Sequence, residues 1–216
     1  MKIISTNIAK LTTIEWRGQT VETGIYKYAV EVPVFLGSED VENDHVIDRR
    51  YHGGPDKACY LYSADHYAFW KNKYPNQDWL WGMFGENLTV GGLNESEVRI
   101  GDRFQIGEAV VQVSQPRQPC FKLGVRFGTQ QIVDDFWVSS FPGVYVRVLT
   151  SGAVQSGDEM KLLSRNPESL TVSQVFSIFR LERNNQKLME SALSEPHLAG
   201  SCRQDIRKIY KRITEN

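Results

Sequence analysis

The chain has 216 residues, of which 41% are hydrophobic and 24% are charged, and these values are typical of one large folded domain or a domain with a small appendage. They exclude intrinsic disorder and a fibrous repeat. The 25 Lys and Arg nearly balance the 26 Asp and Glu, and the net charge of −1 argues against a protein that grips nucleic acid over its whole surface.

The number of cysteines and the hydropathy of the chain indicate in which cellular compartment the protein works. The three cysteines at positions 59, 120 and 202 are odd in number and widely spaced, which argues against a disulfide scaffold and favours a reducing environment. No apolar run approaches the roughly 18 residues that a membrane helix needs. The N-terminus lacks the long apolar region of a signal peptide. We therefore expect a soluble, cytoplasmic protein with no membrane partner.

Short β-rich runs punctuated by glycine fill the chain up to about residue 164. The pattern predicts strands at residues 2–8, 24–30, 57–62, 98–106, 109–114, 144–150 and 159–163. Gly107-Glu108 has the Gly-X form that suits a tight hairpin turn between two of them. So many short strands with glycine turns predict a barrel or a sandwich.

Helical patterns interrupt these strands twice. Ser63 is a candidate cap for a helix that carries Tyr67, Trp70 and Tyr74. Thr129 is a candidate cap for a second helix, whose apolar positions are Ile132, Val133, Phe136 and Trp137.

After Pro167 the glycines nearly vanish and three short helices are predicted. Residues 171–174 read Thr-Val-Ser-Gln, a capping-box pattern ahead of the first helix. A second apolar run follows at residues 188–192 and a third at 206–213. Three such helices pack as a small bundle, since each alone would be marginal.

The charges divide in the same place. Residues 165–216 carry nine Lys and Arg against six Asp and Glu, a net of +3, and the preceding residues carry a net of −4. The last predicted helix presents a basic face, made of Arg203, Arg207, Lys208, Lys211 and Arg212. We interpret it as a solvated face with cations near a helix C-terminus, in preference to a dock for nucleic acid or an acidic protein.

Residues 49–58, Arg-Arg-Tyr-His-Gly-Gly-Pro-Asp-Lys-Ala, form the densest cluster of chemically useful side chains. Gly53 and Gly54 allow the backbone to turn and present its amides to an anion. The flanking cations Arg49, Arg50 and Lys57 add positive charge, and His52 is a titratable donor or ligand. No Walker pattern is present, so a plain Gly-Gly-Pro turn stays an equal alternative.

Residues 114–120, Ser-Gln-Pro-Arg-Gln-Pro-Cys, follow a strongly β run, and the two prolines predict a rigid, non-helical exit from it. A cysteine in such a loop is held still, and Arg117 nearby favours its thiolate. The thiolate is a soft metal ligand and a good nucleophile, whereas the alternative is a small buried cysteine. For Cys59 and Cys202 we expect only burial.

Two weaker signals complete the search. Gly85-Glu86-Asn87 could present a carboxylate and an amide to a pocket, although Asn87 is also an ordinary turn residue, and Lys27 is either an anion contact or a surface lysine. The sequence contains no CxxC, HExxH, GxSxG or GxGxxG pattern. A structural zinc site, a zincin, an α/β-hydrolase and direct nicotinamide binding therefore lack support.

Taken in order, five segments resemble the MOSC domain, which is named after the C-terminal domain of molybdenum cofactor sulfurase. They are residues 23–27, 52–58, 84–88, 100–102 and 115–120. The resemblance is closest to the bacterial YiiM-like subgroup. It implies a mainly β protein with α structure, in which a MOSC-type β-barrel over residues 1–164 precedes a three-helix domain over residues 165–216. The chain departs from the family before His52, where Asn43-Asp44 and Val46 replace the common Gly-Asp and Gln.

The resemblance also implies a molybdenum cofactor (molybdopterin), with no need for pyridoxal phosphate. Cys120 stands where the family's cysteine ligates molybdenum, and the expected catalytic residues are Cys120, His52, Glu86 and Asn87. The expected cofactor-binding residues are Lys27, Arg49, Arg50, Gly53, Gly54, Lys57 and Arg117.

Members of this family type reduce N-hydroxylated compounds such as hydroxylamino purines and amidoximes to amines. The resemblance thus predicts a molybdenum-dependent oxidoreductase that detoxifies N-hydroxylated bases and takes electrons from a separate flavoprotein. A cofactor or sulfur carrier without turnover is the alternative. No nucleic-acid partner is expected, and a homodimer is left open.

Overall fold

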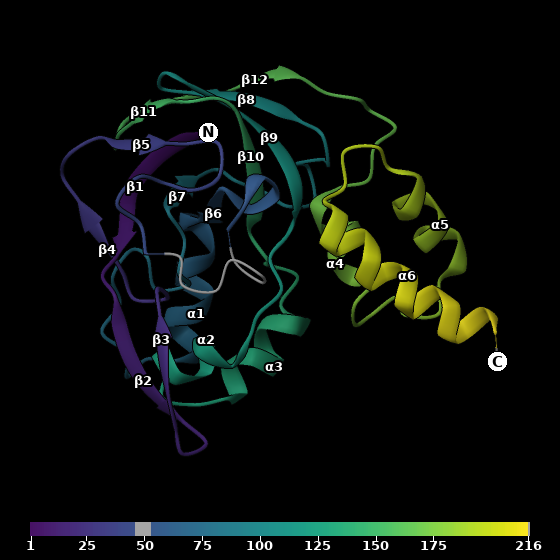
Figure 1. The fold of residues 1–216 in the computed structure, drawn as a ribbon, viewed down its shortest axis with the longest axis horizontal. Helices are drawn as coiled ribbons and strands as arrows, with labels where there is room; N and C mark the ends of the chain where they lie inside the picture. The colour runs from purple at the N-terminus through teal and green to yellow at the C-terminus, as the bar shows by residue number, and fades with distance from the viewer. Residues whose placement is uncertain (46–52, 216) are drawn as a thin grey trace.

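An eight-stranded sheet organises the molecule in the computed structural model, which describes residues 1–45 and 53–215 (Figure 1). Its order is β12-β8-β9-β10-β6-β7-β1-β4, and every pairing is antiparallel except β6 with β7. The strands are β1 (Lys2–Ala9), β4 (Lys27–Val30), β6 (Cys59–Ser63), β7 (Leu88–Gly91), β8 (Arg103–Ile106), β9 (Ala109–Pro116), β10 (Val144–Thr150) and β12 (Met160–Ser164).

The predicted closed barrel is corrected to an open sheet with edge strands β12 and β4. Closure is limited to a bridge between Lys2 and Glu159 and to backbone hydrogen bonds such as that from Met160 N to Met1 O, at 3.0 Å. The reason is that β1 divides its edges among three neighbours. Its first residues meet β7 and the start of β12, whereas residues 6–9 pair with β4, so no ladder runs along β1 and β12.

Most predicted strands are confirmed, with shifted ends. The Gly107-Glu108 hairpin is present, with Ile106 paired to Ala109 and Gly107 at φ 53°. The strand predicted at 98–106 begins only at Arg103, because residues 99–102 turn, with Gly101 at φ 86° and the Asp102 carboxylate accepting from Arg99 N. Likewise residues 55–57 form a 3₁₀ turn ahead of β6.

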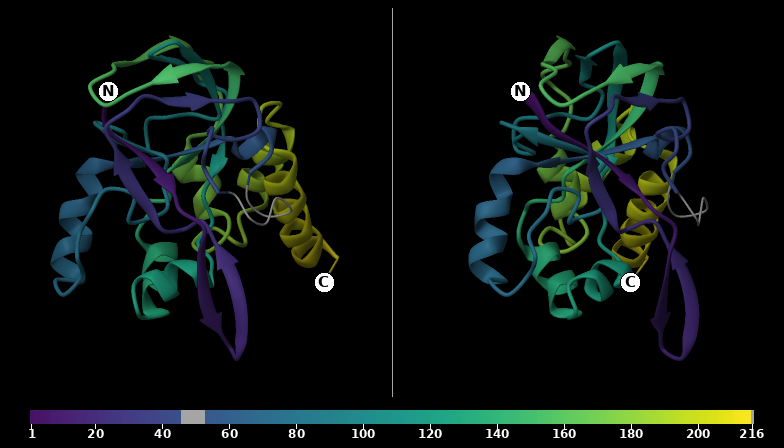
Figure 2. Two further views of the ribbon diagram at one scale, coloured as in Figure 1. Left: turned by 60° about the vertical axis from the view of Figure 1, so that its left-hand side comes forward. Right: turned by 90° about the vertical axis from the view of Figure 1, so that its left-hand side faces the viewer.

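A separate hairpin, which the sequence patterns did not reveal, projects from the body of the molecule (Figure 2). It consists of β2 (Thr12–Trp16) and β3 (Gln19–Thr23), joined by Arg17 and Gly18 at φ 51° and 74°. A further two-stranded antiparallel sheet is formed by β5 (Val34–Leu36) and β11 (Gly152–Val154), near the upper end of the molecule in Figure 1.

Three helices near the sheet enclose an aromatic core. They are α1 (Tyr67–Lys73), α2 (Phe121–Arg126) and α3 (Gln131–Val138), and α1 and α3 match the two predicted helices. Ser63 caps the 3₁₀ turn ahead of α1 rather than α1 itself, and Thr129 Oγ1 accepts from the amide of Gln131 at 3.3 Å. The aromatic cluster includes the fully buried Trp70 and Phe84.

The predicted C-terminal helices are confirmed as α4 (Val172–Ser177), α5 (Gln186–Ser194) and α6 (Gly200–Thr214). The capping box is present, because Thr171 Oγ1 accepts from Gln174 N and the Gln174 side chain accepts from Thr171 N. Most buried residues of these helices share one apolar cluster with the sheet, whereas Phe176 of α4 joins the aromatic cluster. The boundary at residues 164 and 165 stays a prediction. Among the described helices, none is both long and apolar enough to cross a membrane.

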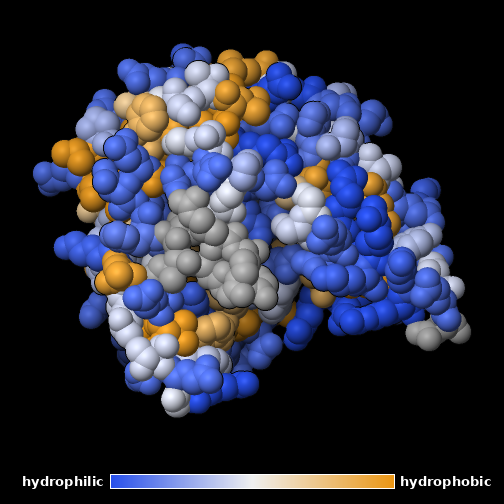
Figure 3. Space-filling model, viewed as in Figure 1, coloured by the Kyte–Doolittle hydropathy of each residue, from blue (hydrophilic) through white to orange (hydrophobic). Residues whose placement is uncertain are grey.

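The predicted basic face on α6 is smaller than its sequence suggests. Arg203 donates to the carbonyls of Leu193, Glu195 and Leu198, so this side chain ties α6 to the end of α5. Lys208 pairs with Asp205 at 2.9 Å. The face of α6 turned toward the viewer in Figure 3 is hydrophilic, as expected for a solvated helix.

Candidate functional site

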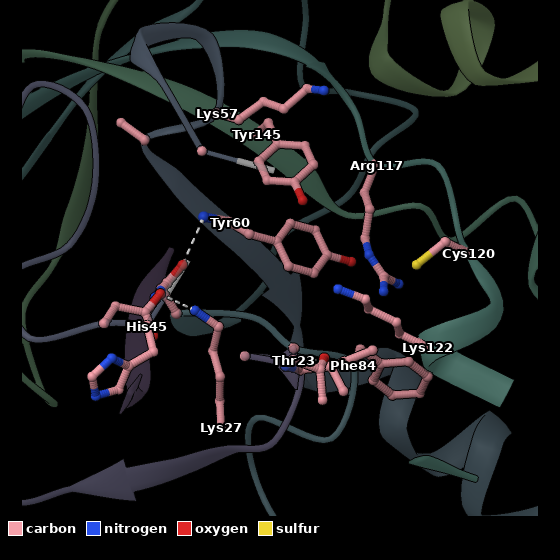
Figure 4. A pocket seen from close by; sticks show the side chains of 17 residues that line it. Thr23, Lys27, His45, Lys57, Tyr60, Phe84, Arg117, Cys120, Lys122 and Tyr145 are labelled. Atoms are coloured by element: carbon pink, nitrogen blue, oxygen red, sulfur yellow. Dashed lines mark hydrogen bonds and ion pairs between the residues drawn. The ribbon is translucent and has the colours of Figure 1, made fainter. Parts of the chain in front are cut away.

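A pocket of about 80 Å³ opens where β3, β4, β6 and β10 meet the loop that leaves β9 (Figure 4). Among the residues that sequence analysis singled out, it is lined by Lys27, Gly53, Lys57, Asn87, Arg117 and Cys120. The structure therefore brings together residues from segments that are far apart in the chain. The sequence-predicted residues Arg49, Arg50 and His52 lie outside the described residues.

Cys120 is the only one of the three cysteines that is not buried. It ends the loop that follows β9 and immediately precedes α2, as the proline pattern predicts. Its sulfur is turned toward the Arg117 guanidinium (Figure 4), close enough for the two groups to interact electrostatically. Cys59 and Cys202 are buried, and burial raises the pKa of both thiols, that of Cys202 to about 12. Cys120 is therefore the candidate soft ligand.

Arg117 is a buried cation whose hydrogen bonding is incomplete. Its guanidinium carbon lies 5.2 Å from the ring centres of both Tyr60 and Phe136. Within residues 1–45 and 53–215, its buried Nη1 atom has no hydrogen-bond partner. A buried donor without an acceptor costs about 1–3 kcal/mol. This arrangement indicates a place for an anionic or strongly accepting ligand.

Lys27 is held by a polar network rather than left as a free cation. Its ammonium pairs with the Asp44 carboxylate, and both side chains are almost fully buried. Asp44 also accepts from Asn87 Nδ2 at 2.9 Å and from Ala9 N at 2.8 Å. Asn87 Oδ1 in turn accepts from Tyr60 N at 3.2 Å. Asn87 thus lines the pocket, but its amide is engaged in positioning the wall.

Of the other predicted anion contacts, Gly53 and Lys57 line the pocket and Gly54 does not. Gly53 and Gly54 adopt φ values of 82° and 79°, the left-handed conformation for which glycine is suited, and only Gly53 lines the pocket. Lys57 follows this turn and also lines the pocket. Burial lowers the pKa of Lys57, while the nearby thiol of Cys202 and the acids Asp205 and Asp56 act in the opposite direction.

Glu86 does not line the pocket. Its carboxylate is completely buried and accepts from Tyr67 Oη, Gly82 N, Phe84 N and Thr89 Oγ1. Burial raises the pKa of Glu86, and these hydrogen bonds act in the opposite direction. These hydrogen bonds give Glu86 a role in holding the loop at residues 82–86, and its predicted contact with a substrate stays a prediction.

We expect Glu86→Gln to lower the free energy of unfolding by about 1–3 kcal/mol. Both oxygens of the native carboxylate accept hydrogen bonds, and the NH₂ group of glutamine would instead point a donor at one of these donors. Urea denaturation of the two proteins measures this effect. Asp78→Asn, on the partly exposed segment after α1, serves as a control and should leave the midpoint unchanged. A Glu86→Gln protein of unchanged stability would contradict this positioning role.

The structure adds residues that sequence analysis missed. Tyr60, Lys122 and Tyr145 line the pocket, and burial raises the pKa of Tyr145 to about 12, while Arg117 acts to lower it. Of these three residues, only Lys122 could have been found from the sequence, because it lies two residues after the predicted ligand Cys120. The tyrosines lie in ordinary strand patterns, so no signal in the sequence separated them from core residues.

A second, larger hollow of about 400 Å³ adjoins the pocket. Lys57, Cys120, Lys122 and Tyr145 line both spaces. Cys120 therefore lies where a small, cation-lined pocket meets a larger hollow.

The donor set fits a metal that arrives with ligands of its own. Within the described residues there is no group of three or more His, Cys, Asp and Glu side chains that could hold an ion. A single accessible cysteine sulfur beside a guanidinium whose Nη1 has no partner in this part of the chain instead suits a metal–organic cofactor that carries an anionic group.

The MOSC domain profile matches residues 48–161, and the chain belongs to this family. Within it, the chain is YiiM/YflK-like. It is 41% identical to an uncharacterised protein, YflK of Bacillus subtilis, over 98% of this chain and 95% of that protein. The crystal structure of YiiM from Geobacillus stearothermophilus superposes with a TM-score of 0.82 at 33% identity, over 97% of this chain and 98% of that one. A protein named reductase from Gibberella moniliformis is 31% identical over 83% of this chain, which spans 32% of that protein.

Proposed function

We propose that this protein is a molybdenum-cofactor-dependent reductase of N-hydroxylated compounds. The observation that carries the proposal is the position of one accessible thiol, Cys120, beside Arg117, whose buried Nη1 lacks a partner among the described residues, at the junction of two hollows. Membership of the MOSC family supports the cofactor, and the relative named reductase supports the reaction class. Hydroxylamino purines and amidoximes are the substrate class.

The residues of the pocket have distinct parts in holding the cofactor. Cys120 provides the thiolate for molybdenum, and Arg117 provides a buried donor for an anionic group. Lys57 adds positive charge at the same wall. Lys27 acts indirectly, because its pairing with Asp44 fixes the wall formed by Asn87. When bound, the cofactor supplies the two-electron redox chemistry of the reaction.

The overall conversion is R–NHOH + 2e⁻ + 2H⁺ → R–NH₂ + H₂O, so the site has to deliver protons to the departing oxygen. Lys57 is the side chain we assign to this task, because burial lowers its pKa and so makes its ammonium a stronger acid than that of an exposed lysine. It lines both hollows beside Cys120. Tyr145, whose pKa lies near 12, keeps its proton and orients the substrate oxygen.

A separate flavoprotein is the proposed source of electrons, because the sequence contains no GxGxxG pattern for a nicotinamide or flavin cofactor of its own. The alternative that the experiment has to distinguish from a reductase is a carrier, which binds the cofactor without turnover. We place the reaction in the cytoplasm.

The proposal is tested with protein expressed in a cofactor-competent host supplied with molybdate. We expect about one molybdenum per chain by elemental analysis. With reduced methyl viologen as donor, we expect N6-hydroxyadenine to be converted to adenine, followed by liquid chromatography, and no conversion without the donor. Molybdenum at this level without conversion of N6-hydroxyadenine or benzamidoxime would overturn the reductase in favour of a carrier.

A further inference from the structure

Asp56 lies at the centre of a network that joins the turn beside the pocket to the C-terminal helices. It is the middle residue of the 3₁₀ turn Pro55–Lys57, which lies beside α6 in both views of Figure 2. Gly53 before this turn lines the pocket, and Lys57 at its end lines both the pocket and the larger hollow. Asp56 itself lines neither space, so any part that it has in the site is indirect.

Both oxygens of the Asp56 carboxylate accept hydrogen bonds from other parts of the chain. Arg147 Nε of β10 donates to Oδ1, and Gly200 N, at the start of α6, donates to Oδ2 at 3.0 Å. Arg147 Nη1 donates in addition to His197 O, in the loop before α6, at 2.8 Å. One carboxylate therefore joins three segments, which are the turn, strand β10 and the beginning of α6.

The start of α6 is itself fixed against β9. Ala199 N, just before the helix, donates to Ser114 O at 3.0 Å, and Ser201 Oγ donates to Gln115 Oε1 at 3.2 Å. The buried Ser114 hydroxyl also donates to Asp56 O at 2.6 Å. The turn and the helix thus rest on the same residue of β9, and the Asp56 carboxylate is tied to a fixed point.

The turn needs such an anchor, because its own residues do little to define its shape. Gly53 and Gly54 have the widest choice of backbone conformation of any residue type, and both adopt positive φ here. A Cβ at Gly54 would meet no described atom within 4 Å beyond its chain neighbours, so packing does not confine this residue. The orientation of the turn therefore depends on the contacts of Asp56.

Lys57 is affected by α6 as well. Burial lowers the pKa of Lys57, and Cys202 and Asp205 of α6, together with Asp56, act in the opposite direction. Ser201 and Asp205 line the larger hollow together with Lys57. The place and the charge of this lysine thus depend on where α6 lies.

We propose that Asp56 is a positioning residue, which fixes the turn at residues 53–57 to α6 so that the C-terminal helices set the geometry of the cofactor pocket. The inference rests on the proposed function and deepens it, because it gives these helices a part in cofactor binding. The link runs through one backbone amide, Gly200 N, and one guanidinium, that of Arg147. Loss of the carboxylate releases the glycine turn and moves Lys57 from its place in the wall.

Two substitutions at Gly200 give a matched test of this link. Gly200 is the first residue of α6, a position that suits proline, and Ala199 before it has the extended ψ of 141° that a following proline favours. Gly200→Pro therefore removes the donor to Asp56 at a place where the helix tolerates proline. Gly200→Ala keeps the donor, and its Cβ would meet no described atom within 4 Å. Asp56→Ala removes both hydrogen bonds of the carboxylate.

The first readout is hydrogen exchange in molybdenum-free protein, followed by mass spectrometry. The Lys57 amide, which donates to Gly54 O at 2.9 Å, should exchange about tenfold faster in Asp56→Ala and Gly200→Pro, as expected when a local opening becomes easier by one hydrogen bond. Gly200→Ala should match the wild type. The amides of β8 should be unchanged in all variants, because the effect is local and not a general loss of stability.

The second readout is molybdenum content, measured on protein from a cofactor-competent host supplied with molybdate. It should fall at least about tenfold in Asp56→Ala and Gly200→Pro, within the usual effect of groups that position a metal site from outside. It should stay normal in Gly200→Ala.

The outcomes separate this inference from the proposed function. Unchanged exchange at Lys57, or faster exchange along the whole chain, would overturn the positioning role. Faster exchange at Lys57 with normal molybdenum content would overturn its link to the cofactor. Wild-type protein without molybdenum would contradict the proposed function, and faster exchange in Gly200→Pro but not in Gly200→Ala would then still support the fixing of the turn by α6.

Discussion

Replacing Cys120 with alanine is expected to remove bound molybdenum and to lower the rate of N-hydroxyl reduction by at least about 100-fold, because even partners outside the direct ligand sphere typically account for 10- to 100-fold in metal sites. The fold should survive, since Cys120 is a half-buried loop residue that contributes no side-chain cap to α2. Molybdenum content by elemental analysis and turnover with reduced methyl viologen are the two readouts.

Cys202→Ala is the matched control for this variant. Cys202 is buried in α6 and its thiol has a pKa raised to about 12, so it offers no thiolate near neutral pH. Its removal should cost some stability through a small cavity and leave the molybdenum content unchanged. Full molybdenum content in Cys120→Ala would show that this cysteine is not the ligand.

Arg117→Met is expected to have opposite effects on cofactor binding and on stability. Burying a charged group whose Nη1 has no partner among the described residues is costly, so an apolar side chain of similar length should leave the melting temperature of the molybdenum-free protein unchanged or higher. The cation–π contacts with Tyr60 and Phe136 offset part of that gain. Molybdenum content should fall at least tenfold, because the buried donor for the anionic group is lost.

Calorimetry of the molybdenum-free proteins and elemental analysis of the loaded ones measure the two effects. Arg126→Met provides a comparison. Among the described residues the buried Nε of Arg126 also has no partner, but its other nitrogens donate to the carbonyls of Ile25 and Lys27, and it does not line the pocket. It should lose stability and keep its molybdenum. A strongly destabilised Arg117→Met protein with normal molybdenum would show that this guanidinium is structural.

Local patterns predicted much of the secondary structure. The β10 strand, the Gly107-Glu108 hairpin and the capping box at Thr171 were each specified by residues within a few positions of one another. The β2–β3 hairpin was missed, because its turn residues Arg17-Gly18 are not a usual turn pair and Arg17 adopts a positive φ.

The sequence by itself determined the family, since five short segments in order carry that information, and it singled out Cys120 as the predicted metal ligand. Only the tertiary structure decided which polar residues share the site. Glu86 and Asn87 are neighbours in the chain, yet the first is completely buried and does not line the pocket, whereas the second lines it. Asp205 comes to Cys120 from the last helix through long-range packing. Burial and hydrogen-bond partners depend on contacts between distant segments, and such contacts leave no periodic trace in a single sequence.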